Sequence, residues 1–230
     1  MHKIKKAFTL SEVLITLSII AVVAVLTIPS FVKNYRKKVY AARIVKLHNQ
    51  LIEAITSEFS DEHITLDEVG NKVSFTDTKS GQETHCDDAD KGICDAGGGY
   101  FLNKYFKLSK KNCSEGDCYA ASYKTPKGED AKGFDTNTKR YCAQTVDGVT
   151  ICAYYDSDNS RTYFEIDTNG TDDPNITGYD AFHLEVVDNK IQDIKDAECN
   201  NKATVTKNNI SDYAGGCMAK IIEDGNKIKY

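Results

Sequence analysis

Tryptophan is absent from the 230-residue chain, and proline occurs only three times. The chain also lacks an excess of positive charge, because its net charge is −5, and this argues against a nucleic-acid partner. It contains no nucleophile elbow, zinc-protease motif or phosphate-binding loop, and its five histidines are scattered. The sequence therefore predicts a protein that is not an enzyme. Its apolar content of 40% is enough for the core of one ordinary domain.

Cysteine, in contrast, is plentiful: all eight cysteines lie beyond residue 85, at irregular short spacings. None of them forms a C-x-x-C pair, and the ligand spacing of a zinc site is missing. This pattern favours disulfides formed in an oxidising compartment. The simplest prediction pairs each cysteine with its nearest neighbour along the chain, which gives Cys86–Cys94, Cys113–Cys118, Cys142–Cys152 and Cys199–Cys217.

One apolar run, residues 8–32, differs from the rest of the chain. It is long enough to cross a bilayer as a helix, which takes about 20 residues. Lysines at positions 3, 5 and 6 precede it, and a basic cluster at 33–38 follows it. A cleaved secretory signal has a shorter apolar stretch, of about 7–15 residues. Neither such a signal nor an ordinary anchor explains Glu12, since a carboxylate in a membrane helix costs about 2.5–3.5 kcal/mol.

The segment KKAFTLSEVLITLSIIAVVAVLTIP resembles the N-terminus of type IV pilins and of the pseudopilins of type II secretion systems. That family has a short basic leader, a peptidase site just before a Phe, a Glu four residues after the Phe, and a Pro further along an apolar helix. The matching positions here are the Ala7/Phe8 junction, Glu12 and Pro29. Ala7 departs from the pattern, because the family usually has Gly there. The resemblance covers roughly residues 1–60.

The resemblance implies a processing and assembly pathway. Residues 1–7 would be a leader peptide that a prepilin peptidase removes, and the new amine of Phe8 would be methylated. The precursor would sit among the lipids of the bacterial cytoplasmic (inner) membrane as a single-pass protein with an extracytoplasmic domain. Residues 8–32 would form its transmembrane helix and later the filament core. An inner-membrane assembly platform would then bring it together with other pilin or pseudopilin subunits in a pilus or pseudopilus.

Elementary electrostatics gives Glu12 a role in that pathway. In a filament of packed apolar helices, the Phe8 amine of one subunit could meet the Glu12 carboxylate of its neighbour. The two charges attract strongly in a low dielectric and are costly when either is buried alone, so the pair would set the assembly register. Alternatively, Glu12 reaches the lipid headgroups from near the end of the helix. The alternative for the whole chain is a membrane-tethered binding module that never polymerises.

Residues 33–60 are predicted to continue the helix in amphipathic form. Five apolar residues recur at steps of three and four and make one stripe: Ile44, Leu47, Leu51, Ile55 and Phe59. Pro29 is expected to kink or locally melt the helix, because it removes one backbone hydrogen bond. Residues 61–230 are expected to form a disulfide-braced globular domain. The predicted fold class is α+β and pilin-like, with a long N-terminal helix whose apolar half protrudes and whose distal half packs on an antiparallel sheet.

Local patterns predict several elements of the globular domain. Residues 77–99 are predicted to form a loop, residues 100–108 a buried helix turn or strand, and residues 163–166 and 182–187 two strands. The Asp147-Gly148 pair predicts a hairpin with one of two registers. A two-residue loop places Cys142 and Cys152 on opposite faces, whereas a three-residue loop, 146–148, pairs them. The disulfide prediction favours the second register.

The stretch DTNGTDDPNITGYD, at 167–180, is rich in oxygen-bearing side chains. Calcium takes six to eight oxygen ligands and is often held by loops of this kind, although the Glu at the twelfth position of calcium loops is missing. In the alternative interpretation the Asp and Asn side chains only cap turns of a solvated loop. No motif requires a cofactor, so calcium is the only candidate. Its predicted ligands are Asp167, Asn169, Asp172, Asp173 and Asp180.

Overall fold

The structure is a computed structural model that describes residues 8–61, 97–131, 133–134, 140–156, 161–187, 190–193, 199 and 217–230. Contacts divide the chain into an N-terminal unit, Met1–Val39, and a globular unit, Tyr40–Tyr230. Because the division falls inside the first helix, the second half of that helix belongs to the same unit as the sheet.

The first helix, α1, runs without interruption over Leu10–Asp61. The predicted single long helix is therefore confirmed. Pro29 lies inside it and every residue around Pro29 is helical, so the helix is not locally melted there; the kink, the other expected outcome, stays a prediction. The physical reason is that proline removes only its own backbone donor, while long helical segments on both sides keep their hydrogen bonds.

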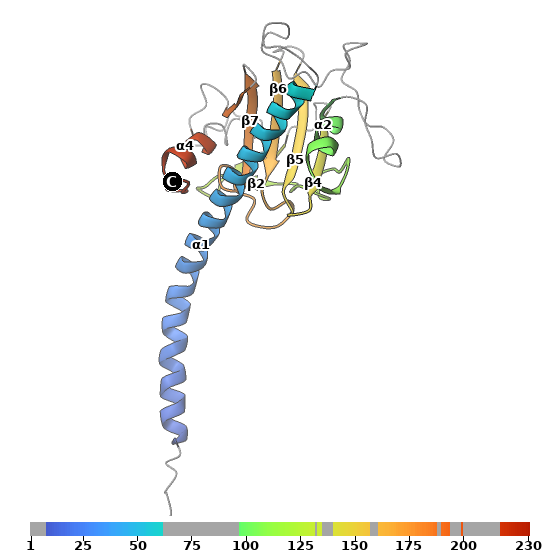
Figure 1. The fold of residues 1–230 in the computed structure, drawn as a ribbon. Coiled ribbons are helices and arrows are strands. Elements are labelled where there is room, and N and C mark those ends of the chain that lie inside the picture. The colour runs from blue at the N-terminus through green and yellow to red at the C-terminus, as the bar shows by residue number, and fades with distance from the viewer. Residues whose placement is uncertain are drawn as a thin grey trace, which may run out of the picture. The chain divides into compact units, whose positions relative to one another are not determined.

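A six-stranded antiparallel sheet follows, in the order β1-β4-β5-β6-β7-β8 (Figure 1). This α+β architecture agrees with the predicted fold class. A separate two-stranded sheet pairs β2 with β3, and two short helices complete the described elements. Their bounds are α2 Gly97–Tyr105, β1 Leu108–Lys110, β2 Tyr123–Lys124, β3 Asp130–Ala131, β4 Tyr141–Thr145, β5 Thr150–Asp156, β6 Arg161–Asp167, β7 Ala181–Val187, β8 Lys190–Asp193 and α4 Cys217–Glu223.

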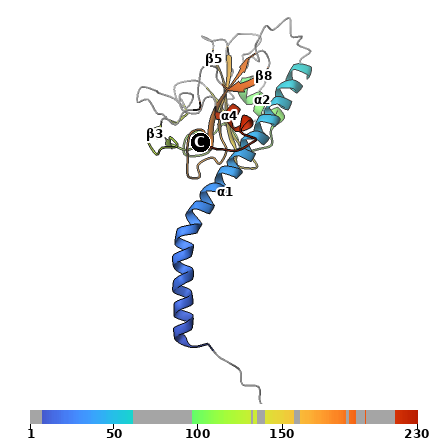
Figure 2. The same ribbon diagram turned by 90° about the vertical axis from the view of Figure 1, so that its left-hand side faces the viewer.

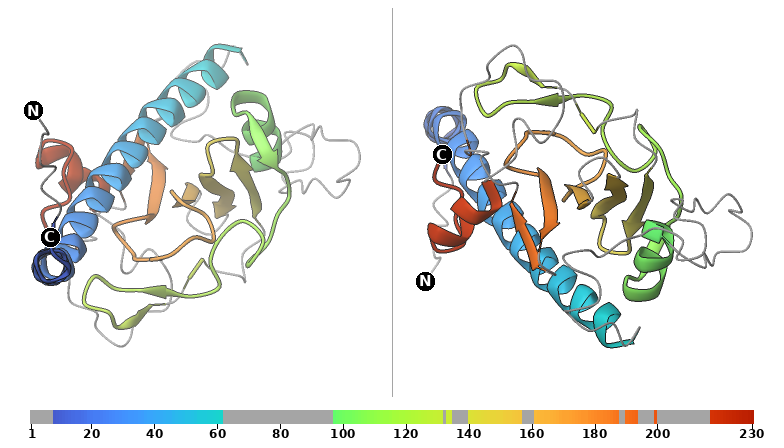
Figure 3. Two further views of the ribbon diagram at one scale, coloured as in Figure 1. Left: turned by 90° about the horizontal axis from the view of Figure 1, so that it is seen from below. Right: turned by 90° about the horizontal axis from the view of Figure 1, so that it is seen from above.

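One face of the large sheet is apolar and carries the main core. The second half of α1 lies across this face, as Figure 3 shows. The helix contributes four of the five residues of the predicted stripe: Ile44, Leu47, Leu51 and Ile55 are at most 2% exposed, and the side chain of Phe59 lies outside what the structure describes. Alternate strand residues meet them, because successive side chains of a strand point to opposite faces. These strand residues include Ala143, Ile151, Phe164, Ile166, Phe182 and Leu184.

The opposite face of the sheet is polar yet buried. A smaller cluster that includes Tyr123 and Phe134 packs there, and Figure 2 shows β3 on the side of the sheet away from α1. Arg140 and Glu165 form an ion pair on this face, with side chains only 8% and 1% exposed. His183, which pairs with Glu165 across β6 and β7, bonds Tyr154 through its Nε2 atom at 3.2 Å. Buried charges need such partners, because an isolated buried charge is strongly destabilising.

The β4–β5 hairpin has the three-residue loop, 146–148. Cys142 lies opposite Cys152, and Gly148 has a φ of 85°. The favoured register is therefore confirmed. The structure contains the disulfides Cys113–Cys118, Cys142–Cys152 and Cys199–Cys217, which are three of the four expected pairs. The fourth pair, Cys86–Cys94, lies outside the described residues.

The glycine run 97–99 was predicted to end a loop, and this prediction is wrong, because these residues begin α2. The reason is close packing. A Cβ atom at Gly98 would stand 2.9 Å from Cβ of Ala153 on β5, nearer than real side chains approach. A glycine here lets α2 lie directly against the sheet, and that gain outweighs the cost of about 1 kcal/mol that glycine imposes on a helix.

Candidate functional site

The N-terminal end of α1 is closed by a reciprocal pair of side chains, Thr9 and Glu12. The backbone N–H of Thr9 donates to Glu12 Oε2 at 2.8 Å, and the Thr9 hydroxyl donates to the same oxygen at 2.8 Å. In return, the backbone N–H of Glu12 donates to Thr9 Oγ1 at 3.3 Å. This is a capping box, in which a Thr and a Glu three residues later satisfy backbone donors that the first turn of a helix leaves free.

The capping box was missed in the sequence analysis although its signature, T-x-x-E, can be read at residues 9–12. It shows that the Glu12 carboxylate has hydrogen-bond partners within its own chain. The helix dipole also favours a negative charge in the first turn. Glu12 is therefore stabilised where it stands before any second subunit is considered.

Three hydroxyl side chains in the apolar run bond back to the helix itself. Thr16 donates to the carbonyl of Val13, Ser18 to that of Leu14, and Thr27 to that of Val23, at 2.8–3.0 Å. A hydroxyl buried in an apolar medium without a partner is costly, and bonding to the preceding turn removes that cost. The run is thus compatible with a lipid or helix-packed environment despite its polar residues.

The apolar side chains of the N-terminal unit are exposed. Fifteen large apolar side chains from Phe8 to Val32 are at least 38% exposed, with Phe8 at 86%. The helix is long and apolar enough to cross a membrane by its length and composition, a property that a signal sequence shares. An exposed apolar surface of this extent indicates contact with lipid or with other proteins.

Comparison with known proteins identifies this segment. Residues 2–28 match the family model of the prokaryotic N-terminal methylation motif. This is the prepilin-type cleavage and methylation segment of type IV pilins and pseudopilins, so the resemblance seen in the sequence is confirmed. No curated protein and no solved structure matches the chain significantly.

The methylation motif connects the start of α1 with a processing pathway. It implies processing by a prepilin peptidase and assembly with other pilin subunits, and with the apolar helix it fits a precursor anchored in the inner membrane. It points to a structural, pilin-like protein. Ala7 lies outside the described residues, and Phe8 is the first residue that the structure describes.

The candidate calcium loop lies between β6 and β7, and its five predicted ligands differ in burial. Asp167 and Asp180 are fully buried, and Asn169 is half-buried, whereas Asp172 and Asp173 are exposed. Within the described residues, no three His, Cys, Asp or Glu side chains are grouped to hold a metal ion. The calcium site therefore stays a prediction.

The two buried carboxylates are held by specific hydrogen bonds. The Tyr123 hydroxyl donates to Asp167 Oδ2 at 2.6 Å, and the backbone N–H of Asn169 donates to Asp167 Oδ1 at 3.1 Å. The backbone N–H of Ile176 donates to Asp180 Oδ1 at 2.6 Å. These bonds tie the loop to β2 and close its own turn around Asp180.

Burial dominates the electrostatics of this pair. It raises the pKa of Asp167 from 3.8 to about 7, against the hydrogen bond from Tyr123, which lowers it. It also raises the pKa of Asp180 well above its usual value, and the nearby charge of Asp167 adds to the effect. Desolvation penalises the charged form, and two neighbouring carboxylates penalise it further.

Within the globular unit, α1 contacts the 167–180 loop through Arg43 and the β4–β5 hairpin through Lys46. Arg43 donates from Nη1 to the backbone carbonyl of Thr168 at 2.9 Å, next to Asp167. Lys46 forms an ion pair with Asp147 at the tip of the β4–β5 hairpin, with 2.6 Å between Nζ and Oδ2. This second contact lowers the pKa of Asp147 through the hydrogen bond from Lys46. Both side chains are exposed, so the pair contributes at most about 1 kcal/mol.

Proposed function

We propose that the protein is a structural subunit, a pilin or pseudopilin, of a type IV pilus or a type II secretion-like filament. The observation that carries the proposal is the methylation motif at residues 2–28, with Glu12 four residues after Phe8. A prepilin peptidase cuts between Ala7 and Phe8. The mature chain remains anchored in the inner membrane by α1. An assembly platform then transfers it into the filament, where α1 packs against the helices of other subunits.

The capping box supports a two-state role for Glu12. In the membrane, the carboxylate is held by Thr9 of its own chain, which reduces the cost of a charge in an apolar surrounding. In the filament, the amine that cleavage creates on the Phe8 of a neighbouring subunit supplies a positive partner, since an α-amine has a pKa of about 7.7–8.0. The charge–charge pair then fixes one register, because a shifted subunit would leave both charges unpaired.

N-terminal sequencing of the mature protein tests this proposal most directly. We expect a chain that begins at Phe8 with a methylated amine. A chain that begins at Met1 would contradict the proposal and favour a membrane-tethered binding module. A start near residue 25 would indicate cleavage of a secretory signal.

Calcium binding by the 167–180 loop is a second candidate function, favoured by buried oxygens without hydrogen-bond partners in the structure. These are Thr168 Oγ1, Asn169 Oδ1, Asn175 Oδ1 and Asp180 Oδ2. Like the carboxylate oxygens of Asp167, these are oxygen donors of the kind that a hard cation prefers. Bound calcium would neutralise the charges of Asp167 and Asp180 and hold the loop against β2.

Calorimetric titration of the full chain in detergent at pH 8 checks this candidate. We expect binding of calcium, with the affinity reduced about ten-fold or more in Asp180→Asn, because one anionic ligand is lost. Glu115→Gln, a change of an exposed acid outside the loop, is the matched control and should bind as the wild type does. Absence of binding at millimolar calcium would remove the candidate and leave a loop closed only by its own hydrogen bonds.

A further inference from the structure

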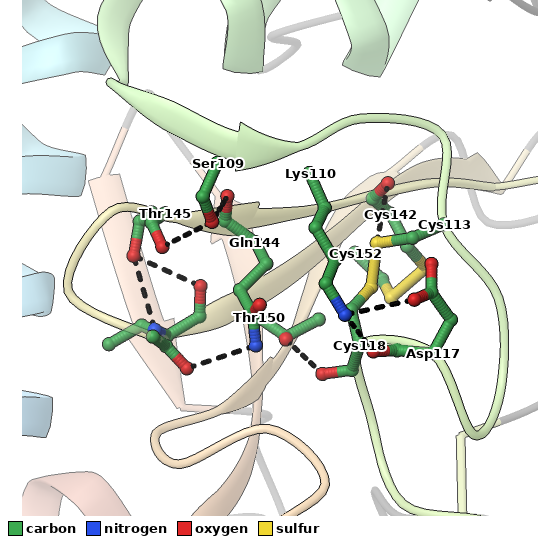
Figure 4. The surroundings of a disulfide bond; sticks show 12 residues. Ser109, Lys110, Cys113, Asp117, Cys118, Cys142, Gln144, Thr145, Thr150 and Cys152 are labelled. Carbon is green, nitrogen blue, oxygen red and sulfur yellow. Dashed lines mark hydrogen bonds and ion pairs between the residues drawn. A yellow bond between two sulfur atoms is a disulfide. The ribbon is translucent and has the colours of Figure 1, made fainter.

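Two of the three described disulfides lie against each other. Cys142 and Cys152 sit directly opposite on β4 and β5, and the segment of Cys113–Cys118 covers them (Figure 4). The backbone N–H of Cys113 donates to the carbonyl of Cys142 at 2.9 Å, and Cys113 Sγ is 3.5 Å from the same oxygen. All four cysteines belong to one cluster on the polar side of the sheet.

Solvent reaches this cluster unevenly. Cys118 and Cys152 are 0% exposed and Cys142 is 3% exposed, whereas Cys113 is only partly buried. Hydrogen bonds hold the outer disulfide in place: Thr150 donates to the carbonyl of Cys118, and Lys110 pairs with Asp117 at 2.9 Å. A thiol arriving from solution therefore meets Cys113 first, and the inner disulfide is shielded by the outer one.

We propose that these four cysteines form a disulfide-exchange site, entered at Cys113, for a thiol of the compartment in which the globular unit resides. A thiolate attacks Cys113 Sγ, so a bond forms between the two sulfurs and the Cys113–Cys118 bond breaks. The electron pair leaves with Cys118, which becomes a thiolate inside the cluster. Exchange proceeds through such mixed disulfides, and its rate depends on which sulfur is accessible.

The Cys118 thiolate then attacks the inner disulfide. A bond from Cys118 to one sulfur of Cys142–Cys152 forms, the inner disulfide breaks, and the other sulfur leaves as a thiolate that takes up a proton. The number of disulfides is unchanged by this step. If the incoming molecule is a dithiol, its second thiolate attacks the sulfur that the same molecule contributes to the mixed disulfide. The bond to Cys113 breaks, Cys113 leaves as a thiolate that takes up a proton, and the dithiol is oxidised to a disulfide while the protein gains two electrons.

The third disulfide, Cys199–Cys217, provides an internal control. It packs in the main core with α4, in the other cluster, and no other described cysteine belongs to that cluster. A thiolate released there has no described disulfide beside it, so exchange should stop at the first step.

Single substitutions in the full chain, purified in detergent, test the relay. Cys113→Ser leaves the thiol of Cys118 next to the inner disulfide. After incubation at pH 8, acid quenching, alkylation and peptide mapping, we expect the free thiol to be distributed over Cys118, Cys142 and Cys152. In Cys217→Ser, we expect all of the free thiol to remain on Cys199. A thiol confined to Cys118 in the first variant, or equal scrambling in both, would overturn the proposal.

The wild-type protein offers an independent test that does not depend on the folding of a variant. With reduced glutathione below one equivalent, the first glutathione adduct is expected at Cys113, together with peptides that link Cys118 to Cys142 or to Cys152. An adduct that forms first at Cys199 or Cys217, or an adduct at Cys113 without linked peptides, would contradict the exchange site.

Discussion

Glu12→Ala and Glu12→Gln are both expected to leave cleavage before Phe8 intact and to reduce incorporation of the chain into filaments about ten-fold or more. The reason is that both variants lack the negative charge that faces the amine of a neighbouring subunit. A difference of about 1.4 kcal/mol in pairing already gives a factor of ten, and an uncompensated buried charge costs about 3–5 kcal/mol. Filaments sheared from cells and the membrane fraction would be compared by immunoblot.

The glutamine variant separates the two roles of Glu12. Gln is as suitable as Glu at the third position of a capping box, so Glu12→Gln keeps a hydrogen-bond acceptor for Thr9 but removes the charge. If Glu12→Gln assembled normally while Glu12→Ala did not, Glu12 would serve as a helix cap and the charge-pair argument would be wrong. Ser11→Ala, at the neighbouring exposed position, is the control and should assemble as the wild type does.

The sequence could predict those parts of the fold that depend on periodicity and local chemistry. The stripe of Ile44, Leu47, Leu51 and Ile55 predicts which face of α1 is buried, because helix geometry alone brings those positions together. The hairpin register also could be predicted, because only one loop length brings Cys142 opposite Cys152. In both cases the residues that decide the structure are close together in the chain.

Features that depend on tertiary packing could not be predicted. Gly98 is needed because β5 approaches it, and nothing near it in the sequence reveals that approach. Likewise, the oxygens of the 167–180 loop look equivalent in the sequence, yet Tyr123, from β2, reaches Asp167 and leaves Asp172 exposed. The burial of the polar face of the sheet could not be predicted for the same reason. A strand with one polar face is expected to expose that face to solvent, whereas here other segments cover it.

Because Asp167 is buried, we also expect a large dependence of the free energy of unfolding on pH. The pKa of Asp167 is about 7 in the folded protein and near 3.8 when it is exposed. Between these values the folded state binds more protons than the unfolded state, so the free energy of unfolding falls as pH rises. The contribution is fully present below pH 4 and is lost as pH rises through 7. A shift of this size corresponds to roughly 4 kcal/mol.

We therefore expect the stability advantage of the wild type over Asp167→Asn to shrink by a few kcal/mol between pH 4 and pH 8. Urea denaturation of the full chain in detergent, with EDTA present to remove calcium and followed by circular dichroism because tryptophan is absent, would measure it. Asp172→Asn, an exposed change in the same loop, should parallel the wild type at every pH. Parallel profiles of Asp167→Asn and the wild type would show that Asp167 does not change its protonation on unfolding. Calcium favours the ionised carboxylates, so calcium added in place of EDTA should raise the free energy of unfolding above pH 7 instead of letting it fall. The same measurement therefore tests both the pH dependence and the calcium candidate.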